Sequence, residues 1–381
     1  MTGSNLAGLS TLCLATVLLS LECGCGNPAQ LQKPVPVSNP GAHAFRATGP
    51  MAYARSGHTA TLLADRRVLI AGGYGLSTIE SHAEIFDPVQ GAFQAAGTLT
   101  RGGHTATRLS NGDVLFAGGV TDPNSQTPVA TASAELFRTA TGLFQPTGNM
   151  IVPRKYFAST LLLDGRVLVT GGITANEEAT DTAELYDPKS GTFSLAAKMN
   201  YPWSNHSAFL LLNGKVLLVA ATSGNLPVEL YDPKADSFTI INGARLGGSD
   251  ATVSLLADGR VLITGGAANY ADMYVGPSEI FDPVAGRLST TGALVVPRMF
   301  HTATLLSDGS VLMAGGFVDA EADVPPTATT EIYDPVKGTF SPGPAMLYPL
   351  AAHTATLLSD GSVLITGGQG PVVSAGAQIF H

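Results

Sequence analysis

The sequence predicts an all-β fold, a seven-bladed β-propeller in which each blade has four antiparallel strands. Three observations carry this prediction. A pair of glycines recurs along the chain, a hairpin signal precedes it, and an aromatic residue before Asp-Pro follows it. Successive pairs are between 45 and 53 residues apart, with a period near 49. Repeats of this length made of short strands are typical of propellers.

Composition agrees with this fold and excludes others. The chain has 381 residues, of which 44 are Gly, 45% are apolar and only 13% are charged. Helical bundles are rich in Glu, Lys and Arg, and disordered chains combine high charge with few apolar residues. The formal net charge is −9 and no Lys/Arg cluster is present, so a nucleic-acid partner is not expected.

The glycine pairs mark the end of the second strand of each unit. The first strand is His-Thr-Ala-Thr-Leu-Leu in its clearest copies, and Asn-Gly or Asp-Gly follows it in six of seven units. This dipeptide predicts a two-residue type I′ hairpin, in which both residues have positive φ. The pairs begin at Gly72, Gly118, Gly171, Gly265, Gly315 and Gly367, and the fourth unit has Ala220-Ala221 instead.

The third strand carries Glu, or Gln in the last unit, two residues before an aromatic residue. Asp-Pro usually follows, and a fourth strand then begins at Phe or Leu. Proline has a fixed φ and no N–H, so Asp-Pro belongs in a turn. The third-strand pairs are Glu84/Phe86, Glu135/Phe137, Glu184/Tyr186, Glu229/Tyr231, Glu279/Phe281, Glu331/Tyr333 and Gln378/Phe380.

The order of these features resembles the kelch repeat of the galactose oxidase-like β-propellers, from about Phe45 to His381. In that family the later aromatic is commonly Trp, whereas this chain has Phe or Leu. Galactose oxidases use a copper site with a Tyr cross-linked to a Cys. The three cysteines here are Cys13, Cys23 and Cys25, so the resemblance does not extend to that copper chemistry. We expect no cofactor and no metal.

The last unit ends at its third strand, so its fourth strand is missing. At the other end, the segment from Phe45 to Met51 matches a fourth strand but has no strands before it. We therefore expect an N-terminal strand to complete the last blade and close the ring, because closure protects sheet edges that would otherwise aggregate. The propeller then comprises residues 43–381.

Residues 1–25 resemble a bacterial lipoprotein signal peptide, and residues 26–42 form a flexible tether. The apolar run from Leu6 to Leu21 is shorter than the about 20 residues of a membrane span. Cys25, which follows Gly24, is the candidate for lipidation, and Cys23 is the alternative. An ordinary secretory signal without lipidation is also open. We expect an exported protein of the bacterial cell envelope, in the periplasm or on the cell surface, held to the membrane by its lipid alone.

Five of the eight histidines occupy one equivalent position in their repeat units. This recurrence favours a structural role between blades over a metal site. A catalytic site needs an asymmetric set of unlike residues. The third-strand Glu repeats in the same way, and we expect it to pair with the Arg three residues before the histidine position. The residues concerned are His58, His104, His206, His301 and His353 for the first set, and Arg55, Arg101, Arg154 and Arg298 for the second.

Function is predicted only as binding of a protein or a glycan at one face of a monomeric propeller, without catalysis. The variable loops after the glycine pairs share this face with the connections between blades, and repeat proteins usually bind through such loops. Aromatic residues and Arg are the expected anchors. The alternative is an enzyme acting on carbohydrate or sugar acids, which a tight cluster of unlike polar residues would favour. The candidate binding residues are Tyr53, Arg55, Arg154, Tyr156, Trp203, Tyr270, Tyr274, Arg298 and Tyr348.

Overall fold

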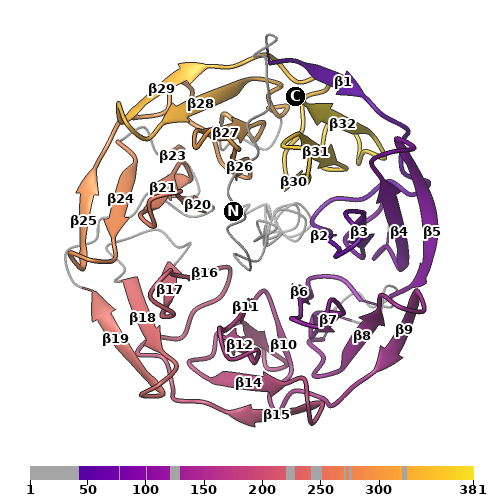
Figure 1. The fold of residues 1–381 in the computed structure, drawn as a ribbon, viewed down its shortest axis with the longest axis vertical. Coiled ribbons are helices and arrows are strands. Elements are labelled where there is room, and N and C mark those ends of the chain that lie inside the picture. The colour runs from indigo at the N-terminus through magenta and orange to yellow at the C-terminus, as the bar shows by residue number, and fades with distance from the viewer. Residues whose placement is uncertain are drawn as a thin grey trace, which may run out of the picture.

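A computed structural model describes residues 43–76, 78–99, 101–120, 129–219, 228–241, 251–269, 272–273, 277–319 and 324–381. These residues form seven four-stranded antiparallel sheets arranged as a ring, which confirms the predicted β-propeller (Figure 1). None of them belongs to a helix long and apolar enough to cross a membrane. The expected signal peptide and tether, with Cys23 and Cys25, lie outside the described residues.

The first strand of each blade is nearest the axis of the ring and the fourth is at the periphery (Figure 1). Blade 1 contains β2 (Thr59–Leu62), β3 (Val68–Ala71), β4 (His82–Asp87) and β5 (Ala92–Thr98), and blade 2 contains β6 (Thr105–Arg108), β7 (Val114–Ala117), β8 (Ala134–Arg138) and β9 (Leu143–Pro146). Blade 3 contains β11 (Ala158–Leu161), β12 (Val167–Thr170), β14 (Ala183–Asp187) and β15 (Thr192–Leu195). Blade 4 contains β16 (Ser207–Leu210), β17 (Val216–Val219), β18 (Val228–Asp232) and β19 (Ser237–Ile241).

The remaining blades repeat this order, and two short hairpins are added. Blade 5 contains β20 (Thr252–Leu255), β21 (Val261–Thr264), β24 (Glu279–Asp282) and β25 (Arg287–Thr290). Blade 6 contains β26 (Thr302–Leu305), β27 (Val311–Ala314), β28 (Thr330–Asp334) and β29 (Thr339–Pro342). Blade 7 contains β30 (Thr354–Leu357), β31 (Val363–Thr366), β32 (Ala377–Phe380) and β1 (Phe45–Ala47), and the added hairpins are β10 (Arg154–Lys155) with β13 (Ile173–Thr174) and β22 (Ala267–Asn269) with β23 (Asp272–Met273).

The hydrophobic core lies between neighbouring blades. All four residues of the second strand are buried in every blade, as the apolar sequence of these strands predicts. One core cluster, for example, combines Leu69 and Ile85 of blade 1 with Val114 and Phe116 of blade 2. Each blade therefore supplies half of two such interfaces, and little of its surface is left for charged residues.

The glycine pairs are explained by backbone geometry and by close contact with the next blade. Gly72 and Gly73 have φ of 64° and 92°, in the left-handed region that favours glycine. A Cβ on Gly72 would lie 2.4 Å from the His104 ring of blade 2, and one on Gly73 would lie 2.7 Å from the carbonyl oxygen of Ser56. The alanine pair of blade 4 lies outside the described residues.

The turn between the first two strands differs from the predicted type I′ hairpin. Only its last residue has positive φ, which is 92° for Gly112 and 73° for Arg66 in blade 1. The Gly112 N–H donates to the carbonyl of Leu109, and the Leu109 N–H donates to Asp113. This is a three-residue loop ending in a left-handed residue, so the dipeptide requires glycine at its second position alone.

The N-terminal strand closes the ring as expected. β1 pairs antiparallel with β32, with Phe45 opposite Phe380 and Ala47 opposite Gln378. Phe45 is 8% exposed, and its ring centroid lies 5.2 Å from that of Phe380. The same third-to-fourth-strand aromatic pairing recurs in other blades, as between Tyr186 and Phe193.

Deleting residues 43–51 should therefore destabilise the whole ring. The deletion removes the β1 pairing and the burial of Phe45 and Met51, and burying one such side chain contributes about 1.5–3 kcal/mol. We expect the free energy of unfolding to fall by at least ~3 kcal/mol in denaturant titrations. Deletion of residues 26–42 is the control and should have little effect. An unchanged melting temperature after the first deletion would contradict this account of closure.

Candidate functional site

The connections between blades lie on the same face as the loops between the second and third strands. Short backbone pairings join the two kinds of loop, as between Ser56 and Tyr74 and between Ala351 and Gln369. We call this surface the loop face. The opposite surface, which carries the Asp-Gly and Asp-Pro turns, is called the turn face.

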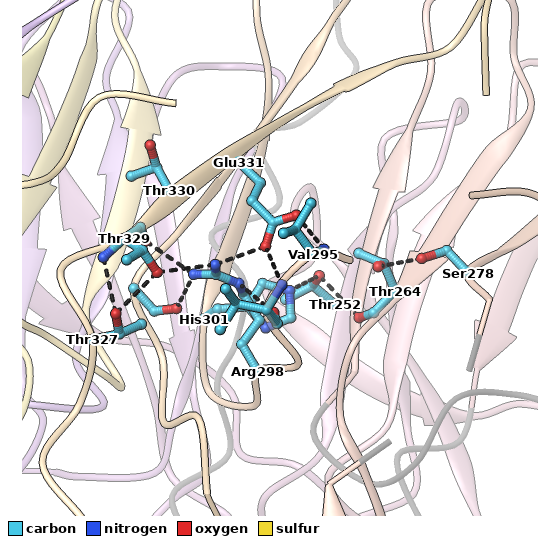
Figure 2. Close-up of polar contacts among 12 residues, drawn as sticks. Thr252, Thr264, Ser278, Val295, Arg298, His301, Thr327, Thr329, Thr330 and Glu331 are labelled. Carbon is cyan, nitrogen blue, oxygen red and sulfur yellow. Dashed lines mark hydrogen bonds and ion pairs between the residues drawn. The ribbon is translucent and has the colours of Figure 1, made fainter. Parts of the chain in front are cut away.

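Under the loop face, a buried Arg–Glu pair forms hydrogen bonds with backbone groups of the loops. In blade 6 the Arg298 guanidinium donates to Glu331 at 2.9 Å and to the carbonyl oxygens of Gly315 and Thr329 (Figure 2). Glu331 also accepts from the backbone N–H of Val295 at 2.7 Å. Burial lowers the pKa of Arg298 from its ordinary value, and Glu331 opposes that shift. The pair satisfies loop backbone groups that would otherwise be buried without partners.

The same pair is present in four blades, which confirms the predicted partner of the third-strand Glu. In each case the guanidinium is almost fully buried and bonds the carbonyl of the first glycine of the pair. The four pairs are Arg55–Glu84, Arg101–Glu135, Arg154–Glu184 and Arg298–Glu331.

The five equivalent histidines join neighbouring blades, as their recurrence predicts. Nε2 of His301 in blade 6 hydrogen-bonds Oγ1 of Thr252 in blade 5 at 2.9 Å (Figure 2). Within the described part of the chain, no group of three His, Cys, Asp or Glu residues is placed to hold a metal ion. The other four bonds are His58–Thr354, His104–Thr59, His206–Thr170 and His353–Thr302.

Four of the candidate binding residues are buried in the structure. Arg55, Arg154 and Arg298 are 0% exposed and form the ion pairs described above. Trp203 is 3% exposed and packs in a core cluster between blades 3 and 4. An anchor must reach its ligand, so the expectation that these side chains are exposed anchors is wrong. The physical reason is that the position three residues before the histidine position faces the blade interior.

Other candidates do lie at the surface. Tyr53 and Tyr348 are 38% and 48% exposed, and Tyr156 is half-buried. Tyr270 and Tyr274 lie outside the described residues. The structure adds Tyr201, which is 38% exposed and which was not among the residues expected from the sequence. The repeat contained the signal, because Tyr53, Tyr201 and Tyr348 each precede the Arg position of their unit by two residues.

These tyrosines belong to an exposed apolar rim on the loop face. The residue three positions before the Arg position is also exposed and aliphatic in three blades. We define the rim as Tyr53, Ile151, Tyr201, Val295, Leu347 and Tyr348, all 38% exposed or more. Beneath it, Met51, Met150, Met199 and Met346 are buried at one equivalent position. A rim of exposed aromatic and aliphatic side chains is typical of a recognition surface.

A polar cluster lies nearer the axis on the same face. The hydroxyl groups of Tyr74 and Tyr156 are 3.2 Å apart, and Lys155 Nζ lies 5.9 Å from the centre of the Tyr156 ring. Lys155 is also paired with Glu177 at 2.9 Å. Tyr156 has φ of 57°, which is strained for an aromatic residue. Burial raises the pKa of Tyr74 well above its ordinary value, so its hydroxyl stays protonated.

Comparison with known families agrees with this geometry. The Kelch motif family model matches residues 154–200, which extend from the buried Arg154 through all four strands of blade 3. The other blades repeat the same pattern of glycine pair, third-strand acid and paired aromatics. The fold is a seven-bladed β-propeller, and its third blade matches the Kelch motif model.

Solved structures share the propeller fold at low sequence identity. The chain is similar to a fungal alcohol oxidase of the AA5 family in complex with copper, with a TM-score of 0.68 and 19% identity. The match covers 89% of this chain and 75% of that one. At this identity, the similarity shows the fold alone. No curated protein matches the sequence.

Blade 4 departs from the buried Arg–Glu pair of blades 1, 2, 3 and 6. Trp203 stands at its Arg position, yet the third strand keeps a fully buried acid, Glu229. Burial raises the pKa of Glu229 above its ordinary value, although hydrogen bonds from Asn200 oppose the shift. Blade 7 also lacks the Arg, with Leu350 in its place, but there the acid is replaced by the neutral Gln378.

Glutamate-to-glutamine variants of blades 3 and 4 should have opposite effects on stability. Glu184→Gln leaves Arg154 buried without its carboxylate, which costs about 3–5 kcal/mol. Glu229→Gln removes a buried acid that has no cation in the described part of the chain, and Gln378 shows that this strand position accepts an amide. Because the raised pKa makes folded Glu229 bind its proton more tightly, stability falls as pH rises above about 4.3, and the Glu229→Gln variant should lose that dependence. Equal losses of the two variants in denaturant titrations at pH 7 would contradict the assigned difference between the blades.

The buried histidines should make the propeller sensitive to acid. Burial lowers the pKa of His104 and His206 to about 3 and that of His353 to about 4. The unfolded chain gains protons on these residues near pH 6.5 and the folded chain does not, so the stability present above pH 6.5 is lost as pH falls toward 4. His206→Phe, which copies Phe157 of blade 3, should reduce the slope of unfolding free energy against pH. The same slope in both proteins would refute the assignment.

Proposed function

We propose that this protein is an exported, membrane-tethered recognition protein that binds a protein or a glycan through its loop face, without catalysis. The observation that carries the proposal is the rim. Its tyrosines and aliphatic side chains are exposed at repeated positions around one face, whereas the Arg residues of that face are buried and paired. Hot spots of recognition surfaces are enriched in such aromatic side chains.

The polar cluster near the axis supports binding better than catalysis. Tyr74 keeps its proton, and the positive charge of Lys155 is balanced by Glu177. The pKa of the five buried histidines is lowered, so they remain neutral and committed to hydrogen bonds between blades. Hydroxyl groups held in this way suit hydrogen bonding to a ligand, because proton transfer near pH 7 requires a group whose pKa is close to 7.

The position of the N-terminal strand agrees with a tether. β32 runs from the loop face to the turn face, and β1 is antiparallel to it, so β1 begins at the turn face beside His381. A lipid on Cys25 or Cys23, joined through residues 26–42, would hold the turn face toward the membrane. The loop face would then point away from the membrane, toward a partner.

Binding at the rim is tested with the propeller, residues 43–381, on a glycan array and in pull-downs from envelope extract. Replacing Tyr53 and Tyr348 by alanine removes two exposed aromatic anchors, and we expect affinity for the captured ligand to fall at least about tenfold. Val89→Ala is the matched control, because Val89 is 94% exposed on the turn face. Equal loss in both variants would place the binding surface elsewhere.

Lipidation is tested separately by mass spectrometry of the mature N-terminus. We expect a diacylated or triacylated cysteine at position 25, and a modified Cys23 would shift the site by two residues. A free, unmodified N-terminus would refute the anchor and leave recognition by the loop face as a separate question.

A further inference from the structure

Blade 4 contains a buried carboxylate for which the described residues supply no cation. Glu229 is 0% exposed, and its Oε2 accepts hydrogen bonds from the backbone and side-chain nitrogens of Asn200, both at 3.1 Å. Its Oε1 is buried and accepts no hydrogen bond of good geometry from the described residues, although the backbone N–H of Tyr201 lies near enough to lower the pKa of the carboxylate. Burying a carboxylate is costly unless it is paired, so the acid of blade 4 is less well satisfied than its counterparts in the blades with an Arg.

The other blades show which donor is missing. In blade 3 the Arg154 guanidinium donates to Glu184 at 2.7 Å, and the carboxylate of Glu184 also accepts two loop N–H groups. Glu229 keeps the first of these loop contacts, from the backbone N–H of Asn200, but no guanidinium of the described residues donates to it. In blade 7, where the Arg is also absent, Gln378 makes the loop contact without a charge. Blade 4 therefore retains a charge for which its own chain supplies no cation among the described residues.

The carboxylate of Glu229 lies directly beneath the loop face. Its partner Asn200 is exposed, so a side chain that donates to Oε2 also reaches solvent. The next residue is Tyr201 of the rim, whose ring is parallel to that of Trp203, with an interplanar angle of 5° and centroids 6.3 Å apart. A carboxylate beside an exposed tyrosine ring offers a cation both an ion pair and a cation–π contact.

We propose that Glu229, Asn200 and Tyr201 form a binding site for a guanidinium group, the arginine side chain of a protein partner. This proposal rests on the proposed function, and it assigns the partner of the loop face to the class of basic proteins. The planar guanidinium fits because it donates to a carboxylate through two N–H groups and stacks on aromatic rings. The net charge of −9 attracts a basic partner.

The single tryptophan makes this site directly observable. Trp203 is the only Trp in the chain and lies beneath Tyr201, so its fluorescence reports on blade 4 alone. The purified protein is titrated with Nα-acetyl-arginine amide at constant ionic strength, up to about 50 mM. Nα-acetyl-citrulline amide is the neutral probe of the same shape. We expect a saturable change with the arginine probe and none with the citrulline probe.

Two variants separate the proposed contact from general electrostatic attraction. Glu229→Gln should weaken binding of the arginine probe at least about tenfold. Asp232→Asn removes one negative charge from the turn face of the same blade and should leave the titration unchanged. No saturable change in the wild-type protein, an equal response to citrulline, or an unchanged affinity in Glu229→Gln would overturn the proposal.

The outcome is independent of the test of the rim. If the tyrosine variants lose the captured ligand and the arginine probe does not bind, recognition by the loop face stands and the guanidinium site falls. If the probe binds at Glu229 and the tyrosine variants bind as the wild type does, the guanidinium site stands and the rim does not carry recognition.

Discussion

The constraint on which this structure depends is closure of the ring. A blade has two apolar faces, and each must be covered by a neighbour, so the last blade must meet the first. The pairing of Phe45–Ala47 with Phe380 and its neighbours in β32 meets that requirement and leaves no open seam. Two-sided burial then explains the composition, because a sheet packed on both faces has apolar central strands and little surface for charge.

Closure also determines how polar groups are used. Groups buried between blades need partners inside the protein, and the repeat supplies them in the same way each time. The Arg–Glu pair binds loop carbonyl and N–H groups in four blades, and a histidine links each of five blades to the one before it. These conspicuous ionisable residues are therefore structural. The recognition that we propose uses residues that differ between blades instead.

Those differences gather on one face. The rim tyrosines, the Tyr74–Tyr156 hydroxyl pair and the carboxylate of Glu229 all lie in or under the loops of blades 1, 3, 4 and 7. Blades 4 and 7 both have another residue at the position of the buried arginine. The third strand of blade 7 has the neutral Gln378, whereas that of blade 4 has the carboxylate of Glu229 close to an exposed asparagine. Keeping a buried carboxylate without a cation among the described residues costs stability, and the proposed guanidinium ligand would offset that cost.

Periodicity in the sequence by itself determined the number of blades, the strand order, the closing strand and the partner of the third-strand glutamates, because equivalent positions in a repeat have equivalent surroundings. It did not determine which side chains reach solvent or where a partner is missing. Trp203 and the arginines are buried, Tyr201 is exposed, Gly112 ends a three-residue loop, and Oε1 of Glu229 accepts no hydrogen bond of good geometry from the described residues. Only the tertiary structure decided these points, since burial and hydrogen bonding depend on neighbours from other strands and blades, far away in the sequence.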